Sequence, residues 1–442
     1  MARRREAALW ITAYVAVAVS PLFVALIDLN PGRGFVVNFS VALGFVGLTM
    51  LGLQFALVAR FRRVAAPVGI DRLLEFHKQI AYVALGLVLL HPILLFLKSD
   101  RFLRLLDVPD APWRARGAVA ATLALLTLVA LSIWRRRLRL NYEAWQFTHD
   151  VLAIFVVVAA TAHALLVRYY LDQPWEQAHA AAMSVAFVAI VLWVRLGRPI
   201  NRRRHPWRVE AVTPEHGRCV SVTVAPITGK GAHAPPFRFT PGQFAWIMAE
   251  QSPFAVTQHP FTISSSAERT DAITLTIKAA GDFTEAVGRL RPGETVYLDG
   301  PFGEFREVPE ETAGIVLIGG GVGVTPLMSI LRTHADRDDR RPVWLFLANE
   351  SEDSIIFREE IDGVCETLPV MAVHTLSHPP PGWEGEQGHL DAAMLRRHLP
   401  PNLAELPYFI CGPPGLLDAA EAALAELGVP AWRVHSERFA MV

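Results

Sequence analysis

Six long apolar runs fill the first 200 residues of the chain, and they restrict its fold more than any other feature. A helix needs roughly 20 apolar residues to cross the hydrocarbon core of a bilayer. The remainder of the 442-residue sequence has the residue pattern of a soluble protein. We therefore predict an integral membrane domain, embedded in the lipid bilayer, with spans at 7–27, 36–59, 72–97, 117–134, 145–167 and 179–197.

Arginine clusters predict the orientation of these spans. The clusters at 3–5, 60–63, 135–139 and 198–204 fall on one side of a six-helix arrangement. Because basic loops stay in the cytoplasm, both termini and the second half of the chain are expected there, with the protein in a bacterial inner or plasma membrane. The opposite loop, 98–116, is also basic, which suits lipid headgroups or an anion site. Since the basic residues form no single stripe, no nucleic-acid partner is expected.

Two of the runs carry histidine pairs with the same spacing. His77 and His91 lie in the third run, His149 and His163 lie in the fifth, and both pairs are 14 residues apart. Fourteen residues make almost four helical turns, so each pair shares one helix face, about 21 Å apart. Both helices run in the same direction, so His77 is expected level with His149, and His91 level with His163.

Two imidazoles that face each other across a helix bundle can ligate a haem iron from both sides. The matched pairs therefore predict two haems, one above the other. The alternatives are unrelated histidines that bond neighbouring helices, or a proton relay. His179, at the start of the sixth run, has no counterpart and is expected at the surface.

The second half of the chain follows a linker expected at 198–206. Short alternating runs such as "CVSVTVAPI" and "AITLTIKAA" predict a small antiparallel barrel. From about residue 311 the pattern becomes strand, glycine turn and helix, which is typical of an α/β nucleotide-binding domain. The predicted domains are 1–204, 205–308 and 309–442.

Several short motifs in this half suggest phosphate and ring binding. In "GGGVGVTP", at 319–326, glycines let the backbone approach a pyrophosphate at a helix N-terminus, although such a turn also serves packing alone. In "HPFTISSS", at 259–266, His259 and the hydroxyls can bind phosphate, and Phe261 can stack on a flat ring. The other motifs are "PGQF" at 241–244, "GDFT" at 281–284, "DGPFG" at 299–303 and "CGPPGLLDA" at 411–419.

This ordered set resembles the ferredoxin–NADP reductase-type flavin and nicotinamide module. Fused behind six helices with paired histidines, the chain resembles the ferric reductase and NADPH oxidase superfamily. The resemblance implies a six-helix bundle, an antiparallel β-barrel FAD domain and an α/β NAD(P) domain, with FAD, NADH or NADPH, and two b-type haems as cofactors. It implies a flavin site at His259, Pro260, Phe261, Thr262, Ser264, Ser265, Gly281 and Thr284, and a nicotinamide-dinucleotide loop at Gly319, Gly320, Gly321, Gly323, Thr325 and Pro326.

The resemblance also implies residues close to the chemistry. Thr262 is expected near the reactive flavin nitrogen, and the strand end at Cys411, Gly412 and Pro413 beside the nicotinamide. Glu437 and Phe439 match a Glu-x-Phe pattern whose aromatic ring covers the flavin. Three residues follow Phe439 here, so this ring is not at the extreme terminus.

The implied activity is a relay from cytosolic NAD(P)H through FAD, the inner haem and the outer haem to an external acceptor. That acceptor is a ferric chelate or O2, with a periplasmic protein or quinone as alternatives. The basic outer loop suits an anionic ferric chelate and equally suits the haem propionates. "PILLFL" after His91, and a second span without arginine, lower the expectation of superoxide production. Glu350 favours NADH, while Arg358 lies near enough to compensate. A haem-free anchored flavin reductase and a nucleotide-regulated transporter or haem sensor are the competing hypotheses.

Overall fold

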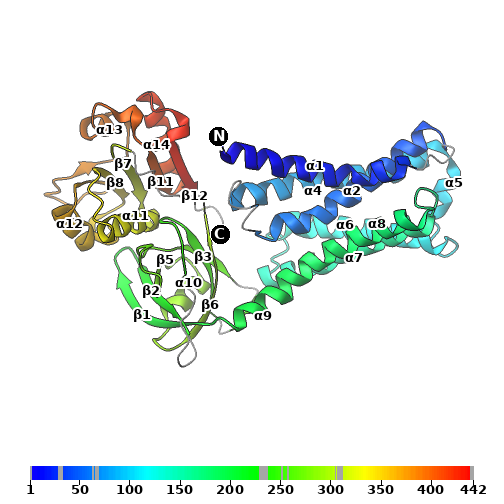
Figure 1. Ribbon diagram of the computed structural model, residues 1–442, viewed down its shortest axis with the longest axis horizontal. Helices are drawn as coiled ribbons and strands as arrows, with labels where there is room; N and C mark the ends of the chain where they lie inside the picture. Colours follow the sequence, from blue (N-terminus) through cyan, green and yellow to red (C-terminus); the bar gives the residue numbers. More distant parts are fainter. Residues whose placement is uncertain are drawn as a thin grey trace. The chain divides into compact units, whose positions relative to one another are not determined.

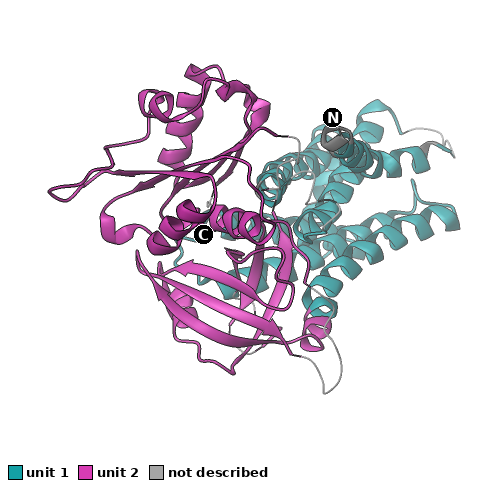
Figure 2. Cartoon of the chain, turned by 60° about the vertical axis from the view of Figure 1, so that its left-hand side comes forward, with its two compact units in different colours: residues 1–198 teal, residues 199–442 magenta. Residues whose placement is uncertain are grey.

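The structure is a computed structural model that describes residues 2–27, 33–61, 64, 69–227, 237–249, 252–255, 258–303, 305 and 312–438. It divides into two compact units, Met1–Arg198 and Pro199–Val442 (Figure 2). The first unit is helical and the second contains two sheets. The predicted boundary between the flavin and nucleotide domains, at 308/309, lies beside residues outside the described part and stays a prediction.

Six helices in the described residues are long and apolar enough to cross a membrane, as predicted (Figure 1). Most extend beyond their apolar runs because the flanking polar residues continue the helix. The last continues through a π-helical turn, η2 (Trp193–Gly197), into α9 (Arg198–Arg203), so much of the segment expected as a linker is helical. The six are α1 (Ala2–Ile27), α2 (Phe35–Val58), α4 (Ile70–Lys98), α6 (Trp113–Trp134), α7 (Tyr142–Val167) and α8 (Pro174–Leu192).

Helix α2 is the most enclosed of the six. In its most apolar stretch 39% of the residues are buried, against 6–17% in the others. Two glycines let the neighbouring helices come close to α2. A Cβ on Gly47 would lie only 2.7 Å from Val88 of α4, and a Cβ on Gly52 only 2.1 Å from Phe187 of α8, so neither position has room for a side chain. Small residues at such contacts are the usual basis of close helix packing in membranes. Helix α2 therefore lies against both α4 and α8.

The first sheet of the second unit is antiparallel, in the order β4-β3-β6-β1-β2-β5. A single bridge between Ile263 and Leu275 joins its two ends, so the described strands form a curled sheet without a continuous closing ladder. The Thr274 N–H of β5 donates to Ser265 Oγ at 3.1 Å. This N–H is therefore not available to a backbone carbonyl, which a continuation of β4 beside β5 would require. The strands are β1 (Trp207–Glu215), β2 (Cys219–Pro226), β3 (Phe244–Met248), β4 (His259–Thr262), β5 (Ile273–Lys278) and β6 (Thr295–Phe302), with the short helix α10 (Asp282–Gly288) before β6.

The second sheet is parallel, in the order β10-β9-β8-β7-β11-β12. Residues of β7 alternate between two apolar cores, one under α11 (Val324–Asp336) and α12 (Arg358–Thr367), the other under α13 (Ala392–His398) and α14 (Pro414–Glu426) (Figure 1). The strand order reverses between β7 and β11, where open α/β sheets bind ligands. The strands are β7 (Ile315–Gly320), β8 (Val343–Asn349), β9 (Val370–Leu376), β10 (Glu386–Gln387), β11 (Tyr408–Gly412) and β12 (Val434–Arg438).

Candidate functional site

The membrane unit brings the predicted histidine pairs together. His77 of α4 and His149 of α7, called the inner pair after their expected orientation, have ring centroids 6.5 Å apart. Two metal–imidazole bonds of about 2 Å plus two ring radii of about 1 Å give roughly 6 Å. His91 of α4 and His163 of α7 are called the outer pair. The inner spacing therefore suits one metal ion held between two imidazoles.

The hydrogen bonds of the outer pair determine the proton positions on its rings. His163 Nδ1 lies 2.7 Å from the Arg114 carbonyl oxygen of α6. His91 Nδ1 lies 2.9 Å from the Ser40 carbonyl oxygen and 3.0 Å from Ser40 Oγ, both on α2. A carbonyl oxygen only accepts, so Nδ1 of each ring carries the proton. Nε2 of each ring then keeps the lone pair that a metal ligand needs.

His149 of the inner pair has the same proton arrangement by a different route. Its Nδ1 lies 3.2 Å from Ser132 Oγ of α6. Ser132 Oγ uses its own proton to bond the Leu128 carbonyl oxygen at 2.8 Å, so it accepts from His149. In three of the four histidines the network therefore leaves Nε2 as an acceptor, the form that ligates iron. Among the described residues no group of three or more His, Cys, Asp or Glu side chains could hold a metal ion.

The inner pair has aromatic and charged neighbours at its end of the bundle. The Trp145 ring centroid lies 5.3 Å from that of His149, and the Arg135 guanidinium lies 5.2 Å from the Trp145 ring. Asp150, next to His149 in sequence, forms an ion pair of 2.6 Å with Arg195, which the π-helical turn η2 carries. π-Helical turns are rare and often occur at functional sites. The inner pair therefore lies near a tryptophan ring, an arginine and an ion pair.

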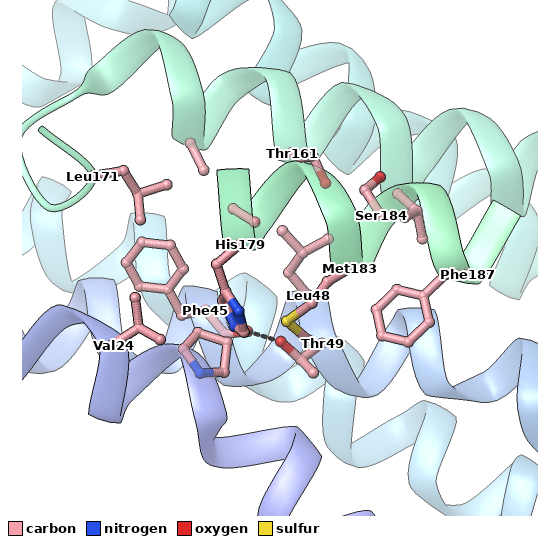
Figure 3. A pocket seen from close by; sticks show the side chains of 14 residues that line it. Val24, Phe45, Leu48, Thr49, Thr161, Leu171, His179, Met183, Ser184 and Phe187 are labelled. Carbon is pink, nitrogen blue, oxygen red and sulfur yellow. Dashed lines mark hydrogen bonds between the residues drawn. The ribbon is translucent and has the colours of Figure 1, made fainter. Parts of the chain in front are cut away.

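His179 departs from the sequence-based expectation. It lines a pocket of about 30 Å³ between α1, α2, α7 and α8, and Figure 3 shows its ring beside Thr49 of α2. Its Nε2 is buried and has no hydrogen-bond partner among the described residues. Helix α8 begins at Pro174, so His179 lies in the second turn and not at a surface end. The pocket is mostly apolar and has room for little more than water.

The flavin motif forms the edge strand β4 and the turn after it. The His259 and Phe283 ring centroids are 4.4 Å apart, and Phe261 lies parallel to Phe283 at 6.2 Å. Phe261 is half-buried, whereas Thr262 is buried. Pro260 lies between these aromatic residues, opposite Trp246 of β3. The structure thus gathers the ring-binding candidates on one edge of the sheet.

The other predicted flavin residues bond within the protein. Ser264 Oγ lies 2.8 Å from Thr276 Oγ1, and Ser265 Oγ accepts from the Thr274 N–H. Thr284 Oγ1 accepts from the Gly281 N–H at 3.0 Å, at the start of α10. These contacts shape the turns in which the residues lie. Their flavin roles stay predictions.

We expect Phe261→Ala to weaken flavin retention or use while leaving the haem content near normal. The substitution removes a half-exposed ring from the edge of the first sheet, far in sequence from the membrane helices. Flavin and haem are quantified on the same purified sample. Phe254→Ala, which removes another exposed aromatic ring of the same half, is the control. Unchanged FAD content and turnover in Phe261→Ala would rule out the stacking role.

The glycine loop connects β7 to α11 as the sequence predicts. Gly319 and Gly320 end β7, and the short helical turn Gly321–Gly323 precedes α11. A Cβ on Gly320 would lie 2.6 Å from Leu416. Thr325 Oγ1 donates to the Val322 carbonyl oxygen at 2.8 Å, which closes the turn. Pro326 is buried in the first turn of α11, where a missing N–H costs no helical bond.

The predicted nicotinamide residues meet at the switch point of the second sheet. Cys411 of β11 lies opposite Gly319 of β7 on one side and Glu437 of β12 on the other. Burial, and then the charge of Glu437, hold the pKa of the Cys411 thiol well above its ordinary range, so the thiol stays protonated at neutral pH. Gly412 ends β11, and Pro413 caps α14. Phe439 lies outside the described residues.

Polar residues on α11 join the two halves of the second unit, which the sequence did not suggest. Ser329 Oγ donates to the Ser265 carbonyl oxygen at 2.8 Å, and Thr333 Oγ1 accepts from the Ala267 N–H at 3.0 Å. Arg332 Nη1 donates to the Ser264 carbonyl oxygen at 2.7 Å. The available signal was the spacing of these α11 residues, at i, i+3 and i+4, which places them on one face of the helix. Helix α11, which begins at the glycine loop, therefore also bonds the turn that follows β4, at residues 264–267.

Family models match three parts of the chain. The ferric reductase-like transmembrane component matches residues 43–160, an FAD-binding domain matches 227–305, and an oxidoreductase NAD-binding domain matches 317–422. The transmembrane match contains His77, His91 and His149, and it ends three residues before His163. The FAD match contains the aromatic edge strand, and the NAD match contains the glycine loop and Cys411.

Known proteins are similar to part of the chain. NADH-cytochrome b5 reductase 1 of Mortierella alpina is 30% identical over 191 residues, 42% of this chain and 64% of that protein. The plasma membrane-associated coenzyme Q6 reductase PGA3 of Saccharomyces cerevisiae is 32% identical over 160 residues, 36% of this chain and 50% of that protein. The chain thus spans half to two thirds of these relatives. The FAD/NAD-binding domain of nitric oxide dioxygenase from Vibrio cholerae O1 biovar El Tor aligns with a TM-score of 0.47 and 23% identity, covering 53% of this chain and 98% of that one.

The domain matches and the six apolar helices give this chain a membrane part followed by parts similar to FAD-binding and oxidoreductase NAD-binding domains. A ferric reductase-like transmembrane domain precedes an FAD domain and an NAD domain of the ferredoxin–NADP reductase type. By this combination the chain belongs to the ferric reductase and NADPH oxidase superfamily.

Proposed function

We propose that the protein takes electrons from cytoplasmic NADH and passes them through FAD and two bis-histidine haems to an acceptor on the outer face of the membrane. The observation that supports this most directly is the proton arrangement of the histidines. Nδ1 of His91, His149 and His163 donates to acceptor oxygens, so Nε2 is available for iron. The 6.5 Å between the inner rings fits this assignment.

The protein's own residues hold and orient the cofactors. When bound, FAD takes a hydride from the nicotinamide and releases single electrons, which the haem irons carry one at a time. His77 and His149 hold the inner haem, and His91 and His163 hold the outer haem. The aromatic edge at Phe261 covers one side of the flavin. The Gly319–Gly323 loop and the N-terminus of α11 hold the dinucleotide phosphates.

We propose an anionic ferric chelate as the external acceptor. Lys98, Arg101, Arg104 and Arg114 are exposed around α5 (Asp100–Leu103), on the side opposite the arginine clusters. Arg116 of the same loop is half-buried and donates to two carbonyl oxygens of that loop, so it stabilises the loop. An exposed basic surface attracts anionic chelates. O2, a periplasmic protein and a quinone are tested as competing acceptors. The arginine clusters support cytoplasmic placement of both termini in a bacterial inner or plasma membrane.

We propose NADH as the donor. Glu350 is exposed directly after β8, where a carboxylate bonds the ribose hydroxyl of NADH and repels the 2′-phosphate of NADPH. Arg358 is paired with Glu352 at 2.8 Å, and Asp362 lies 3.9 Å from it, so its charge is already balanced. The relatives named as NADH-cytochrome b5 reductases support the same choice.

An anaerobic absorbance spectrum of the detergent-purified protein, before and after adding each nucleotide, tests this function. We expect bis-histidine haem bands that become reduced, with NADH faster than NADPH. Glu350→Gln should reduce the ratio of NADH to NADPH efficiency by at least about tenfold, since a hydrogen bond to a charged group contributes roughly 1.5–3 kcal/mol and about 1.4 kcal/mol corresponds to a factor of ten. Glu426→Gln, another exposed acid in the same domain, serves as the control. Flavin bleaching without any haem band would instead favour the anchored flavin reductase.

A further inference from the structure

Helix α2 carries polar residues at the same spacing as the histidines of its neighbour α4. Ser40 and Gln54 are 14 residues apart, as are His77 and His91. Fourteen residues make almost four turns, so Ser40 and Gln54 share one face of α2. Ser40 bonds His91 and Gly47 packs against Val88, so the two helices run antiparallel and Gln54 lies at the level of His77. Helix α2 thus presents one polar side chain at each histidine level of α4.

Helix α6 supports the histidines of α7 in the same way. Arg114 and Ser132 are 18 residues apart, which is five helical turns, and they bond His163 and His149. The two levels nevertheless differ in kind. Both outer histidines bond main-chain carbonyl oxygens, which no substitution removes, whereas at the inner level His149 bonds the Ser132 side chain. The inner level can therefore be changed by mutation without moving the backbone.

Gln54 is the member of this set whose hydrogen bonds are incomplete. Its side chain is only 6% exposed, and neither amide atom has a hydrogen-bond partner among the described residues. His77 Nδ1 is likewise buried and, within the same described part, unpaired. A buried polar group without a partner is unfavourable, so such groups are normally satisfied. A buried amide and a buried imidazole Nδ1, both unpaired among the described residues, therefore lie at the same level of two helices that pack against each other.

We propose that Gln54 and Ser132 are positioning residues for the inner haem ligands. Each accepts the Nδ1 proton of its histidine, Gln54 from His77 and Ser132 from His149, and thereby sets the reduction potential of the inner haem. This inference rests on the haem assignment proposed above. An acceptor on Nδ1–H makes the imidazole a better electron donor, which stabilises the ferric ion. Removal of either acceptor raises the potential of that haem.

A redox titration of the full-length purified protein, followed by haem absorbance, tests the proposal. Gln54→Met and Ser132→Ala should each raise the same one of the two haem potentials. We expect about a tenfold change in the ferric-to-ferrous equilibrium, which is ~59 mV for one electron. Gln54→Glu and Ser132→Thr keep an acceptor oxygen and should not raise this potential. A merely structural role would not produce shifts confined to one haem.

Thr49→Val is the matched control on α2. Thr49 is buried, but its hydroxyl bonds the Phe45 carbonyl oxygen of its own helix at 3.0 Å, so both potentials should stay unchanged. If Gln54→Met loses the inner haem, a return of that haem's absorbance in Gln54→Glu supports the proposal. Two haems with unshifted potentials, or variants that move different haems, overturn it and leave the proposed function standing. A wild-type protein without haem overturns both.

Discussion

Replacing His149 by alanine is expected to stop electron flow to the external acceptor while NADH still reduces the flavin. His149 supplies one of two imidazoles at the inner level, and its ring lies 6.5 Å from that of His77. Loss of a residue that only supports a metal ligand costs about 10–100-fold in affinity or activity, so loss of the ligand should cost at least about 100-fold. Stopped-flow absorbance follows the flavin and haem bands of one sample. His77→Ala should give the same result as His149→Ala, because His77 supplies the other imidazole of the inner pair.

Two further variants make this result specific. His163→Ala should leave the inner haem reducible by NADH and still block the external acceptor, because the electron stops one level further along. His179→Ala removes another histidine of the bundle that belongs to neither pair, and its electron transfer should resemble that of the wild type. Normal reduction of the outer haem in His149→Ala would contradict the vertical pairing.

Of the glycine-to-alanine substitutions in the Gly319–Gly323 loop, Gly323→Ala is expected to slow NADH-driven flavin reduction the most. The new Cβ would lie 2.2 Å from the Cys411 carbonyl oxygen and 2.7 Å from Gly412 Cα. Strand β11 is paired with β7 and β12, so its backbone cannot move aside and the loop must. Such overpacking costs about 1–3 kcal/mol. We expect NADH-driven flavin reduction to fall roughly 5- to 150-fold, the ratio this energy corresponds to, with haem content unchanged.

The control for this substitution is Gly415→Ala. Gly415 lies in the first turn of α14 with no atom within 4 Å of an added Cβ, so this variant should keep wild-type rates. Rates of flavin reduction and thermal unfolding of both variants separate a displaced loop from a destabilised domain. Wild-type NADH affinity and rate in Gly323→Ala would show that the loop does not form the nucleotide site.

Local sequence patterns were sufficient for most elements of the fold. The apolar runs predicted six membrane helices, and the turn "GGGVGVTP" correctly predicted a strand followed by a helix. Helix ends were less accurate, because polar residues such as Arg198–Arg203 continue a helix once its first turns are formed. The small antiparallel barrel was predicted from alternating runs separated by turn residues. In the described residues the Ser265 hydroxyl takes a backbone donor of β5, which alternation cannot reveal.

The sequence by itself determined which residues lie on a common face, because helical periodicity converts the 14-residue spacing of the histidines into alignment. Only the tertiary structure decided which atoms those histidines bond. The contact of His91 with Ser40 spans 51 positions, and that of His163 with the Arg114 carbonyl spans 49. It also placed His179 inside the bundle and buried the Gln54 side chain. Hydrogen bonds between helices depend on the rotation and approach of both partners, and no periodicity within one helix contains that information.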